Sequence, residues 1–231
     1  MICVPVASNK IEKALEMIKS ANETADMIEL RLDFFTKLGE KELKQMLRTT
    51  KKPVICTCRR LEEGGLFRGT ESQRISLLKK CMKFGADYID IEFETKKIQK
   101  EKLREYKEEN KFKTKTILSK HYFGSTPEYE LLLKLMNSMK KEKPDVIKII
   151  TKANNVNDNH IIFQLLKEAK RKEISIISFC MGPLGTDSRI LSMPFGAFLT
   201  FASLNAGAES ADGQIPIDAM KKIYAGLRVM M

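Results

Sequence analysis

The 231-residue sequence has no tryptophan, only two histidines and only five cysteines. The cysteines are odd in number and follow no small-domain spacing, which argues against a disulfide framework and for a reducing compartment. Cys56 and Cys58 form a C-x-C pair with no second pair and no histidine nearby, too few ligands for a metal site. No apolar run approaches the roughly 20 residues that span a membrane, and the first residues lack a basic leader. We therefore expect a soluble, cytoplasmic protein with no membrane partner.

Acidic residues are outnumbered by basic ones, and the formal net charge is +11. Such an excess is one mark of nucleic-acid-binding proteins, so an RNA-binding module is one alternative. The charges are mixed in sign, however, as in the segment 96–113, which is typical of a solvated helix face. Aromatic residues make up only 7% of the chain, which disfavours the stacking surfaces of single-strand binders. A positive field that attracts an anionic metabolite explains the charge as well, and we predict no nucleic-acid partner.

Short β-branched runs alternate with longer amphipathic segments along the whole chain. The predicted strands are Ile2–Ala7, Met27–Phe34, Val54–Arg59, Tyr88–Phe93, Thr114–His121, Val146–Thr151, Ser175–Met181 and Leu199–Leu204. Eight such units in one series without a linker predict parallel strands joined by crossover helices. A count of eight favours a closed (β/α)8 TIM barrel, and no glycine-rich dinucleotide fingerprint follows the first strand. We therefore expect a single α/β barrel domain over residues 1–231.

Several helix starts are marked by side chains that commonly cap helices. The seventh unit contains several helix breakers and predicts only a short helix between residues 182 and 196. The last helix is expected over residues 217–230. The predicted capping residues are Ser8 and Asn9, the pair Ser125 and Thr126 ahead of Pro127, and Asn157 or Asp158.

Lys148 interrupts the apolar run V-I-K-I-I of the sixth predicted strand. Burying an ammonium among apolar neighbours is costly, so one interpretation is that this side chain points outward and reaches solvent between helices. The other is a Schiff-base lysine at the carboxyl end of a barrel strand, where barrel enzymes place catalytic groups. A desolvated amine loses its proton more readily and then acts as a nucleophile.

The two histidines lie in different contexts. His121 ends the fifth predicted strand, one strand before Lys148, which favours general acid–base work over a purely structural role. His160 stands at the start of a predicted helix and is expected to face solvent or to cap the helix.

Charged residues also stand at or near the ends of other predicted strands. Glu29 and Arg31 are alternate residues of the second strand and project to the same face, where a structural ion pair is one possibility. Arg59 and Arg189 could be surface cations, although arginine's planar fork suits a substrate carboxylate or diol. Asp90 and Glu92 lie in the fourth strand and are expected in a buried polar layer, with no chemistry assigned to them.

Over essentially its full length the chain resembles the type I 3-dehydroquinate dehydratases. Each short motif would be weak alone, but six occur in order, each at a predicted strand end. They are IELRLDFF at 28–35, CRRLEEGGLFRG at 58–69, SKHYFGSTP at 119–127, DVIKIITKA at 145–153, CMGPLGTDSR at 180–189 and ESADGQIP at 209–216.

The resemblance implies a hydro-lyase that converts 3-dehydroquinate to 3-dehydroshikimate and water in the shikimate pathway, without metal or diffusible cofactor. It implies that Lys148 forms an imine with the substrate, that His121 is the acid–base group and that Glu63 positions it. Homodimers are also implied. The substrate-binding residues implied are Glu29, Arg31 and Arg59 for the hydroxyl-bearing edge, Arg189, Ser210 and Gln214 for the carboxylate and lid, and Met181 and Phe201 for the ring.

The chain departs from the family pattern in two motifs. The family's S-N-H-D-F is S-K-H-Y-F here, and its lid S-A-P-G-Q is S-A-D-G-Q. Two additional residues also lie between Phe201 and Ser210, so the role of Phe201 is the least certain. A class I aldolase, which also uses a barrel lysine imine, is the alternative enzyme, but the residues around Lys148 favour the dehydratase.

Overall fold

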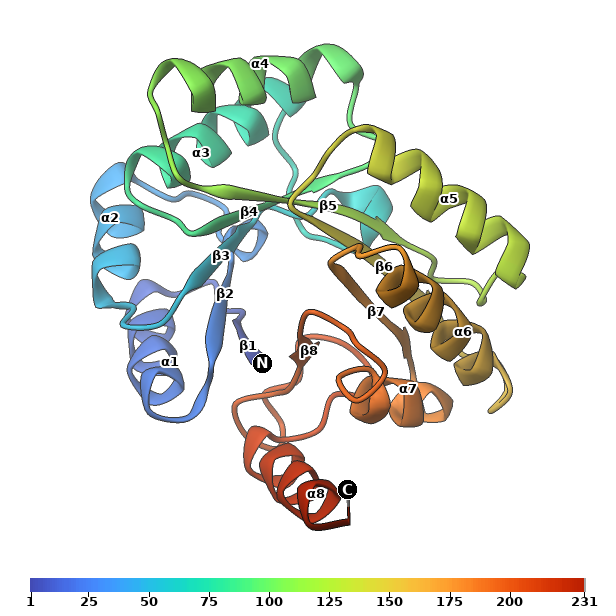
Figure 1. Cartoon of the computed structure of the whole chain (residues 1–231). Coiled ribbons are helices and arrows are strands. Elements are labelled where there is room, and N and C mark those ends of the chain that lie inside the picture. The colour runs from blue at the N-terminus through green and yellow to red at the C-terminus, as the bar shows by residue number, and fades with distance from the viewer. Residues whose placement is uncertain (231) are drawn as a thin grey trace.

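Eight β-strands alternate with eight α-helices along residues 1–230, the part of the chain that the computed structural model describes; side chains are described through residue 227 (Figure 1). The strands are β1 Ile2–Val6, β2 Met27–Arg31, β3 Val54–Thr57, β4 Tyr88–Glu92, β5 Lys115–His121, β6 Val146–Lys152, β7 Ile176–Met181 and β8 Thr200–Phe201. The helices are α1 Ile11–Thr24, α2 Glu40–Thr49, α3 Glu71–Lys83, α4 Lys97–Glu109, α5 Tyr129–Lys141, α6 Asp158–Arg171, α7 Thr186–Leu191 and α8 Ile217–Met230.

All the strand pairs are parallel, and the sheet order is β7-β6-β5-β4-β3-β2-β1-β8. Consecutive strands are therefore neighbours, and β8 lies beside β1, as a barrel requires. Strands β7 and β8 stand at the two ends of this order and are not paired with each other. One backbone hydrogen bond joins the two segments: the Phe198 N–H donates to the Ile176 carbonyl at 2.7 Å. The fold is thus the predicted TIM barrel, nearly closed. The short seventh helix, α7, is also confirmed.

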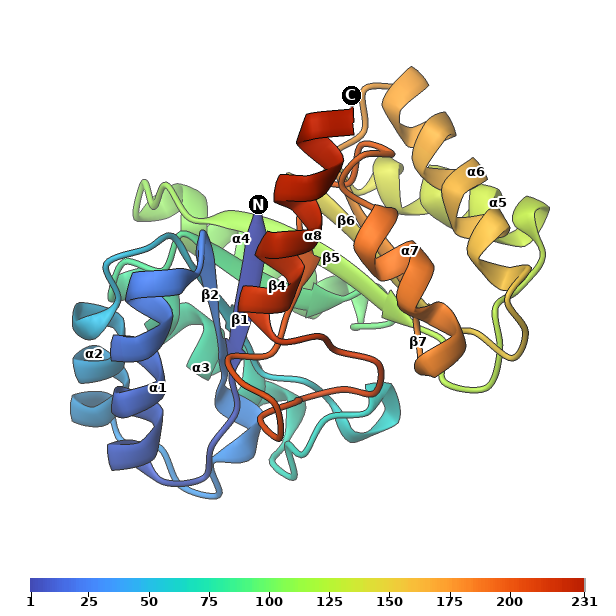
Figure 2. The ribbon, with the colours of Figure 1, turned by 90° about the horizontal axis from the view of Figure 1, so that it is seen from below.

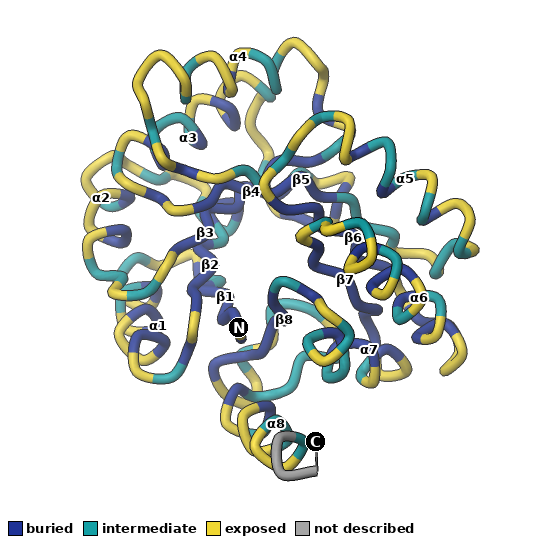
Figure 3. The backbone as a smooth tube through the Cα atoms, viewed as in Figure 1, coloured by how far each residue is buried: buried dark blue, intermediate teal, exposed yellow. Residues whose placement is uncertain are grey.

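Apolar packing forms one cluster inside the barrel and another between the sheet and the helices. Figure 3 shows buried strands at the centre and helices whose outer faces are exposed. The helices contribute residues at helical spacing, such as Leu132, Met136 and Met139 of α5, to the outer cluster. The inner cluster includes Met27, Ile55, Tyr88, Ile117, Val146, Ile177 and Leu199.

Strand periodicity arranges the barrel interior in layers, because every second residue of a strand points inward. The inner apolar cluster fills the layer nearest the amino ends of the strands. The residues two positions further along each strand form the next layer, toward the carboxyl ends. This second layer is largely polar and is built from Glu29, Thr57, Asp90, Ser119 and Lys148, with Phe179 and Phe201 completing it. The fold therefore puts a polar layer directly above an apolar one.

Three strands end two or three residues earlier than predicted, and β1 and β4 end one residue earlier. The second strand stops at Arg31 and continues as a 3-10 turn over Leu32–Phe34, in which Asp33 binds the Arg31 side chain and accepts the Leu66 N–H. The third strand stops at Thr57, and a second 3-10 turn spans Leu61–Glu63. The eighth strand is reduced to two residues. Beyond the ends of β2 and β3, carboxylates accept backbone N–H groups: Asp33 from Leu66 and Glu92 from Arg60.

The predicted helix caps are wrong. Helix α1 begins after Lys10, helix α5 after Glu128, and Asn157 precedes α6 without a side-chain cap. Ser8 bonds to the Lys10 backbone and Thr126 to Thr151 and the Lys152 carbonyl, so these hydroxyls stabilise loops instead. Asn9 and Ser125 also make no cap, and Asp158 binds the backbone of the preceding turn. Local sequence identified polar residues near helix starts but not which backbone groups they reach.

Thr70 forms a capping box with Gln73 at the start of α3, a feature with reciprocal side-chain and backbone hydrogen bonds. Thr70→Ala should lower the free energy of unfolding by about 1 kcal/mol, because an N–H of the first turn loses its acceptor. Urea denaturation with matched slopes measures the change. Asn157→Ala is the control, since its side chain caps nothing, and equal losses in the two variants would refute the assignment.

Candidate active site

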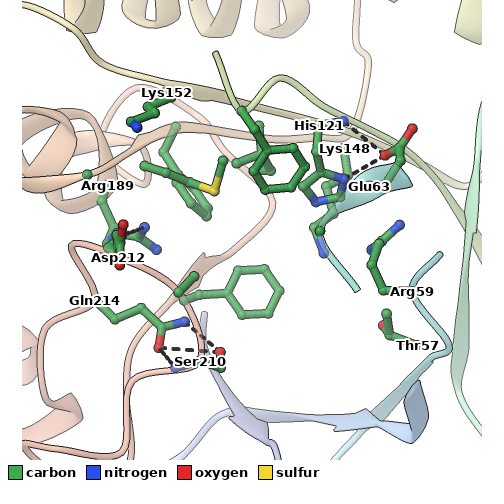
Figure 4. Close-up of a pocket in the computed structure, with 18 of the residues that line it drawn as sticks. Thr57, Arg59, Glu63, His121, Lys148, Lys152, Arg189, Ser210, Asp212 and Gln214 are labelled. Atoms are coloured by element: carbon green, nitrogen blue, oxygen red, sulfur yellow. Dashed lines mark hydrogen bonds and ion pairs between the residues drawn. The ribbon is translucent and has the colours of Figure 1, made fainter. Parts of the chain in front are cut away.

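A cavity of about 350 Å³ opens at the carboxyl end of the barrel, above the polar layer (Figure 4). All of the site residues expected from the sequence line this one cavity, which brings together residues of β2, β3, β5, β6, β7 and β8 and of the loops that follow strands. Figure 2 shows the long segment between β8 and α8 extending over the same end of the barrel. The lining residues include Glu29, Arg31, Arg59, Glu63, His121, Lys148, Met181, Arg189, Phe201, Ser210 and Gln214.

Lys148 points from β6 into the barrel and is only 5% exposed, so the outward-pointing alternative is wrong. Its Nζ lies 3.1 Å from Asp90 Oδ2 and 3.5 Å from Glu29 Oε1, and 4.8 Å from the centre of the Phe201 ring. Of the apolar neighbours in sequence, Ile147 and Ile149 alternate to the other face of the strand, whereas Ile150 shares the inward face and lines the same cavity. Two carboxylates compensate the buried charge.

Asp90 is the residue whose importance the sequence analysis missed. Its carboxylate contacts Lys148 on one side and Arg59 NH2 at 2.7 Å on the other, and it accepts the Ser119 hydroxyl at 2.6 Å. Burial acts to raise the pKa of Asp90, but the charges of Arg59 and Lys148 outweigh it and hold this pKa well below its usual range. The sequence did contain a signal: Asp90 is the third residue of β4, as Lys148 is of β6, so both side chains point to the same face of the sheet.

Arg59 is buried between two carboxylates rather than exposed. Its guanidinium binds Asp90 and Glu92, and Glu92 is bound in turn by Arg74 of α3 at 2.5 Å. Burial lowers the pKa of Arg59, but these carboxylates reverse the effect and raise it overall. Arg74 also reaches Glu71, so alternating charges run from Lys148 outward to α3. This chain of ion pairs fixes the position of Arg59 at the cavity wall.

His121 and Glu63 form a hydrogen-bonded pair at the cavity rim, drawn with dashed lines in Figure 4. Glu63 Oε2 lies 2.9 Å from His121 Nδ1 and also accepts the His121 backbone N–H at 3.1 Å. Burial, reinforced by the charges of Arg59 and Lys148, holds the pKa of His121 well below its usual range. Burial raises the pKa of Glu63 to about 7. The imidazole is therefore neutral near pH 7, as a general base must be.

Glu29 and Arg31 share a face, as expected, but the structure gives each a different partner. Glu29 accepts the Thr57 hydroxyl at 2.7 Å and lies beside Lys148. Arg31 is held by Asp33 through two hydrogen bonds of 2.9 and 2.8 Å. The turn after β2 thus holds Arg31 at the cavity wall. Glu29 is not paired with Arg31 and instead contacts the amine of Lys148.

Arg189 differs from the other cavity arginines because no carboxylate among the described residues neutralises it. It is 1% exposed, its NH2 donates to the Asp212 carbonyl at 3.1 Å, and its Nε has no hydrogen-bond partner in the described part of the chain. Its guanidinium lies 4.3 Å from the Phe179 ring centre. Burial lowers the pKa of Arg189 to about 10. A buried cation without a counter-ion, lining a cavity, is suited to binding an anionic group.

The segment between β8 and α8 contributes Ser210 and Gln214 to the cavity. The two side chains bind each other, and the Ser210 N–H donates to Gln214 Oε1 at 2.9 Å. The segment is held in place through the Asp212 carbonyl, which also accepts the Gly182 N–H at 3.3 Å. Gly213 permits this contact because its φ is +76° and a Cβ there would lie 2.5 Å from the Gly182 carbonyl oxygen.

Apolar side chains complete the wall. Met181 ends β7 and Phe201 ends β8, and both face the cavity together with Phe179. The sequence analysis did not single out Thr57, Phe123 or Lys152, which also line it. Within the described part of the chain, no three His, Cys, Asp or Glu side chains converge as a metal site, and no helix is long and apolar enough to cross a bilayer.

Gly213→Ala should release the segment 209–215 from Gly182, because the added methyl group collides with the carbonyl oxygen. Hydrogen exchange of these amides should accelerate, while the barrel strands keep their protection. Gly207→Ala is the matched control: its φ is also positive, at +84°, but a Cβ there meets nothing within 4 Å. Both changes add left-handed strain of about 1–2 kcal/mol. Equal exchange in the two variants would show that the close contact is unimportant.

Comparisons with known proteins agree with this geometry. The family model described as type I 3-dehydroquinase matches residues 2–230. A 3-dehydroquinate dehydratase of Desulfotalea psychrophila is 35% identical over 224 residues, 97% of this chain and 96% of that protein. The crystal structure of the Geobacillus kaustophilus 3-dehydroquinate dehydratase superposes with a TM-score of 0.91 at 28% identity, covering 99% of this chain and 91% of that one. The type I enzyme of Clostridium difficile, solved with covalently modified comenic acid, gives 0.90 at 25% identity, covering 100% and 93%. The chain belongs to the type I 3-dehydroquinase family.

Proposed function

We propose that the protein is a 3-dehydroquinate dehydratase of the shikimate pathway that works through an imine on Lys148, without metal or diffusible cofactor. The proposal rests on two buried groups that line one cavity: the amine of Lys148 and the guanidinium of Arg189, which no carboxylate among the described residues neutralises. Dehydroquinate carries a ketone for the first group and a carboxylate for the second. Covalently modified comenic acid in the Clostridium difficile relative is consistent with covalent chemistry in this barrel.

Imine formation requires Lys148 to give up a proton before its Nζ attacks the ketone carbon. Glu29 Oε1 lies 3.5 Å from Nζ and is the available acceptor, because Asp90 stays ionised between Lys148 and Arg59. Attack by Nζ on the ketone carbon gives a carbinolamine. The two protons that the nitrogen loses, one through Glu29 and one through Nε2 of His121, pass to the former ketone oxygen, which leaves as water. The product is a protonated imine next to the Asp90 carboxylate, which stabilises its charge as it stabilised the ammonium.

The elimination then needs a base and, one step later, an acid. A neutral His121 takes the proton on the carbon next to the imine, and the electron pair moves into the imine to give a neutral enamine. The enamine expels the β-hydroxyl, which leaves as water with the proton that His121 now carries. Each proton transfer by a positioned group contributes roughly 10²–10⁴ in rate. Hydrolysis of the conjugated imine releases 3-dehydroshikimate and restores Lys148.

The other cavity residues bind and orient the substrate. Glu63 holds the imidazole through Nδ1, the role of the third group in nucleophile–base–orienter triads. Arg189 binds the carboxylate, and Glu29, Arg31 and Arg59 bind the hydroxyl-bearing edge. Met181 and Phe201 contact the ring, and the segment with Ser210 and Gln214 covers the substrate. Holding the reactants this way supplies proximity, which can lower a barrier substantially.

The wider context follows from the same proposal. All five cysteines are free and buried, which fits the reducing cytoplasm as the compartment. We also propose that the barrel is the single catalytic domain and that it works as a homodimer, as the family resemblance implies.

Borohydride added together with dehydroquinate should reduce the imine and leave a stable adduct on Lys148. Peptide mass mapping should find the modification at that residue and not at Lys152, which lines the same cavity and is the internal control. Lys148→Met should remove both the adduct and turnover. An aldolase would not produce the conjugated-enone absorbance of dehydroshikimate, so unmodified protein or absent absorbance would contradict the proposal.

Arg189→Met should raise KM for dehydroquinate about 10- to 100-fold, the equivalent of losing charge-assisted hydrogen bonds to the carboxylate. The effect on kcat should be smaller, because the ketone end of the site is unchanged. Steady-state kinetics gives both constants. Arg171→Met, which removes an exposed arginine paired with Glu168, should change neither. An unaltered KM in Arg189→Met would rule out the carboxylate role.

A further inference from the structure

Lys120 stands immediately before His121, near the end of β5, and its side chain reaches the back of the His121–Glu63 pair. Its Nζ lies 3.6 Å from Glu63 Oε1 and 3.2 Å from Glu94 Oε1, and 5.9 Å from the Tyr122 ring centre. Its side chain is 21% exposed, so it lies at the boundary between the buried pair and solvent. Lys120 is absent from the cavity lining and does not face the substrate space.

The two oxygens of Glu63 have different surroundings. Oε2 accepts two hydrogen bonds, from His121 Nδ1 and from the His121 backbone. Oε1 is buried and has no hydrogen-bond partner among the described residues, but it makes the 3.6 Å ion pair with Lys120. A buried carboxylate oxygen without a hydrogen bond is costly. The ammonium of Lys120 forms an ion pair with that oxygen, and Arg59 is the other cation that favours the ionised carboxylate.

We propose that Lys120 is a positioning residue, whose ammonium keeps Glu63 ionised and thereby holds His121 as the Nδ1–H tautomer with a free lone pair on Nε2. An ionised Glu63 can only accept hydrogen bonds, so the Nδ1 that faces it must carry the proton. A protonated Glu63 could donate to Nδ1 instead, which would place the imidazole proton on Nε2 and block the base. The catalytic consequence rests on the proposed function.

The protonation of Glu63 is balanced finely enough for one cation to decide it. Burial raises the pKa of Glu63 to about 7, and Lys120 is among the charges that lower it. Among the other charges near Glu63, Arg59, just after β3, favours its ionisation, whereas Asp90 and Glu92 of β4 oppose it. Protonation of His121 is disfavoured by the charges of Arg59, Lys148 and Arg31. It is favoured by the charge of Asp90.

The tautomer can be read directly, because the chain has only two histidines. Nitrogen-15 histidine correlation spectra near pH 8, one unit above the pKa of Glu63, should show His121 mainly as the Nδ1–H form in the wild-type protein. In Lys120→Met the Nε2–H population should grow about fivefold, the change that one pKa unit produces at that pH. His160 serves as the internal control in each spectrum. Lys120→Arg should restore the wild-type tautomer.

The kinetic arm is the pH profile of kcat with dehydroquinate. In Lys120→Met the acid limb should move up by about one pH unit, so kcat near pH 7 falls about fivefold and returns to within about twofold near pH 9. Lys120→Arg should keep the wild-type profile. Glu94→Gln is the matched control, because it removes the exposed partner of Lys120 and leaves the charge beside Glu63, so its acid limb should not rise.

The outcomes separate this inference from the proposed function. An unchanged tautomer in Lys120→Met overturns the inference even if the enzyme dehydrates dehydroquinate. A uniform loss of kcat at every pH also overturns it, since that result indicates a structural role alone. A wild-type protein with no dehydroquinate turnover refutes the proposed function and the catalytic consequence, while a shifted tautomer would still support the electrostatic role of Lys120.

Discussion

The contact of Asp90 with both Lys148 and Arg59 is the interaction on which the rest of the site depends. Three charges meet in the barrel interior with almost no exposure, and removing Asp90 would leave Lys148 and Arg59 each ion-paired with a single carboxylate. The same carboxylate that makes the buried amine tolerable also orients it toward the cavity. Stability and reactivity are therefore tied to one group, which has no direct access to bulk water.

The layered interior explains how a polar site can sit within a hydrophobic fold. An apolar floor near the amino ends of the strands seals the barrel, and the ion pairs begin two residues further along each strand. The charges continue outward through Glu92 to Arg74, a fully buried residue of α3. A network that satisfies its members is tolerable where an isolated buried charge is not. The helix layer thus takes part in fixing the cavity wall.

Two departures from charge balance mark where chemistry is proposed. Arg189 is buried with no carboxylate counter-ion among the described residues, which leaves a positive site for an anion to occupy. Burial, reinforced by the charges of Arg59 and Lys148, keeps the imidazole of the His121–Glu63 pair neutral, while burial raises the pKa of Glu63 to about 7. The first imbalance favours binding and the second favours proton transfer. Both arise from groups on different strands and could not be judged from one segment.

The sequence by itself determined the barrel, because eight alternating units of strand and helix periodicity leave few other ways to bury their apolar faces. It also selected Lys148 and His121, since a charged residue in an apolar strand is costly enough to need a reason. Only the tertiary structure decided that Lys148 points inward, that Asp90 is its partner and that Arg31 pairs with Asp33 rather than Glu29. The hydroxyl of Thr126, predicted near a helix start, was likewise engaged by Thr151 and the Lys152 carbonyl on another segment. These features depend on distances across the barrel, whereas periodicity records only which face of a strand a residue occupies.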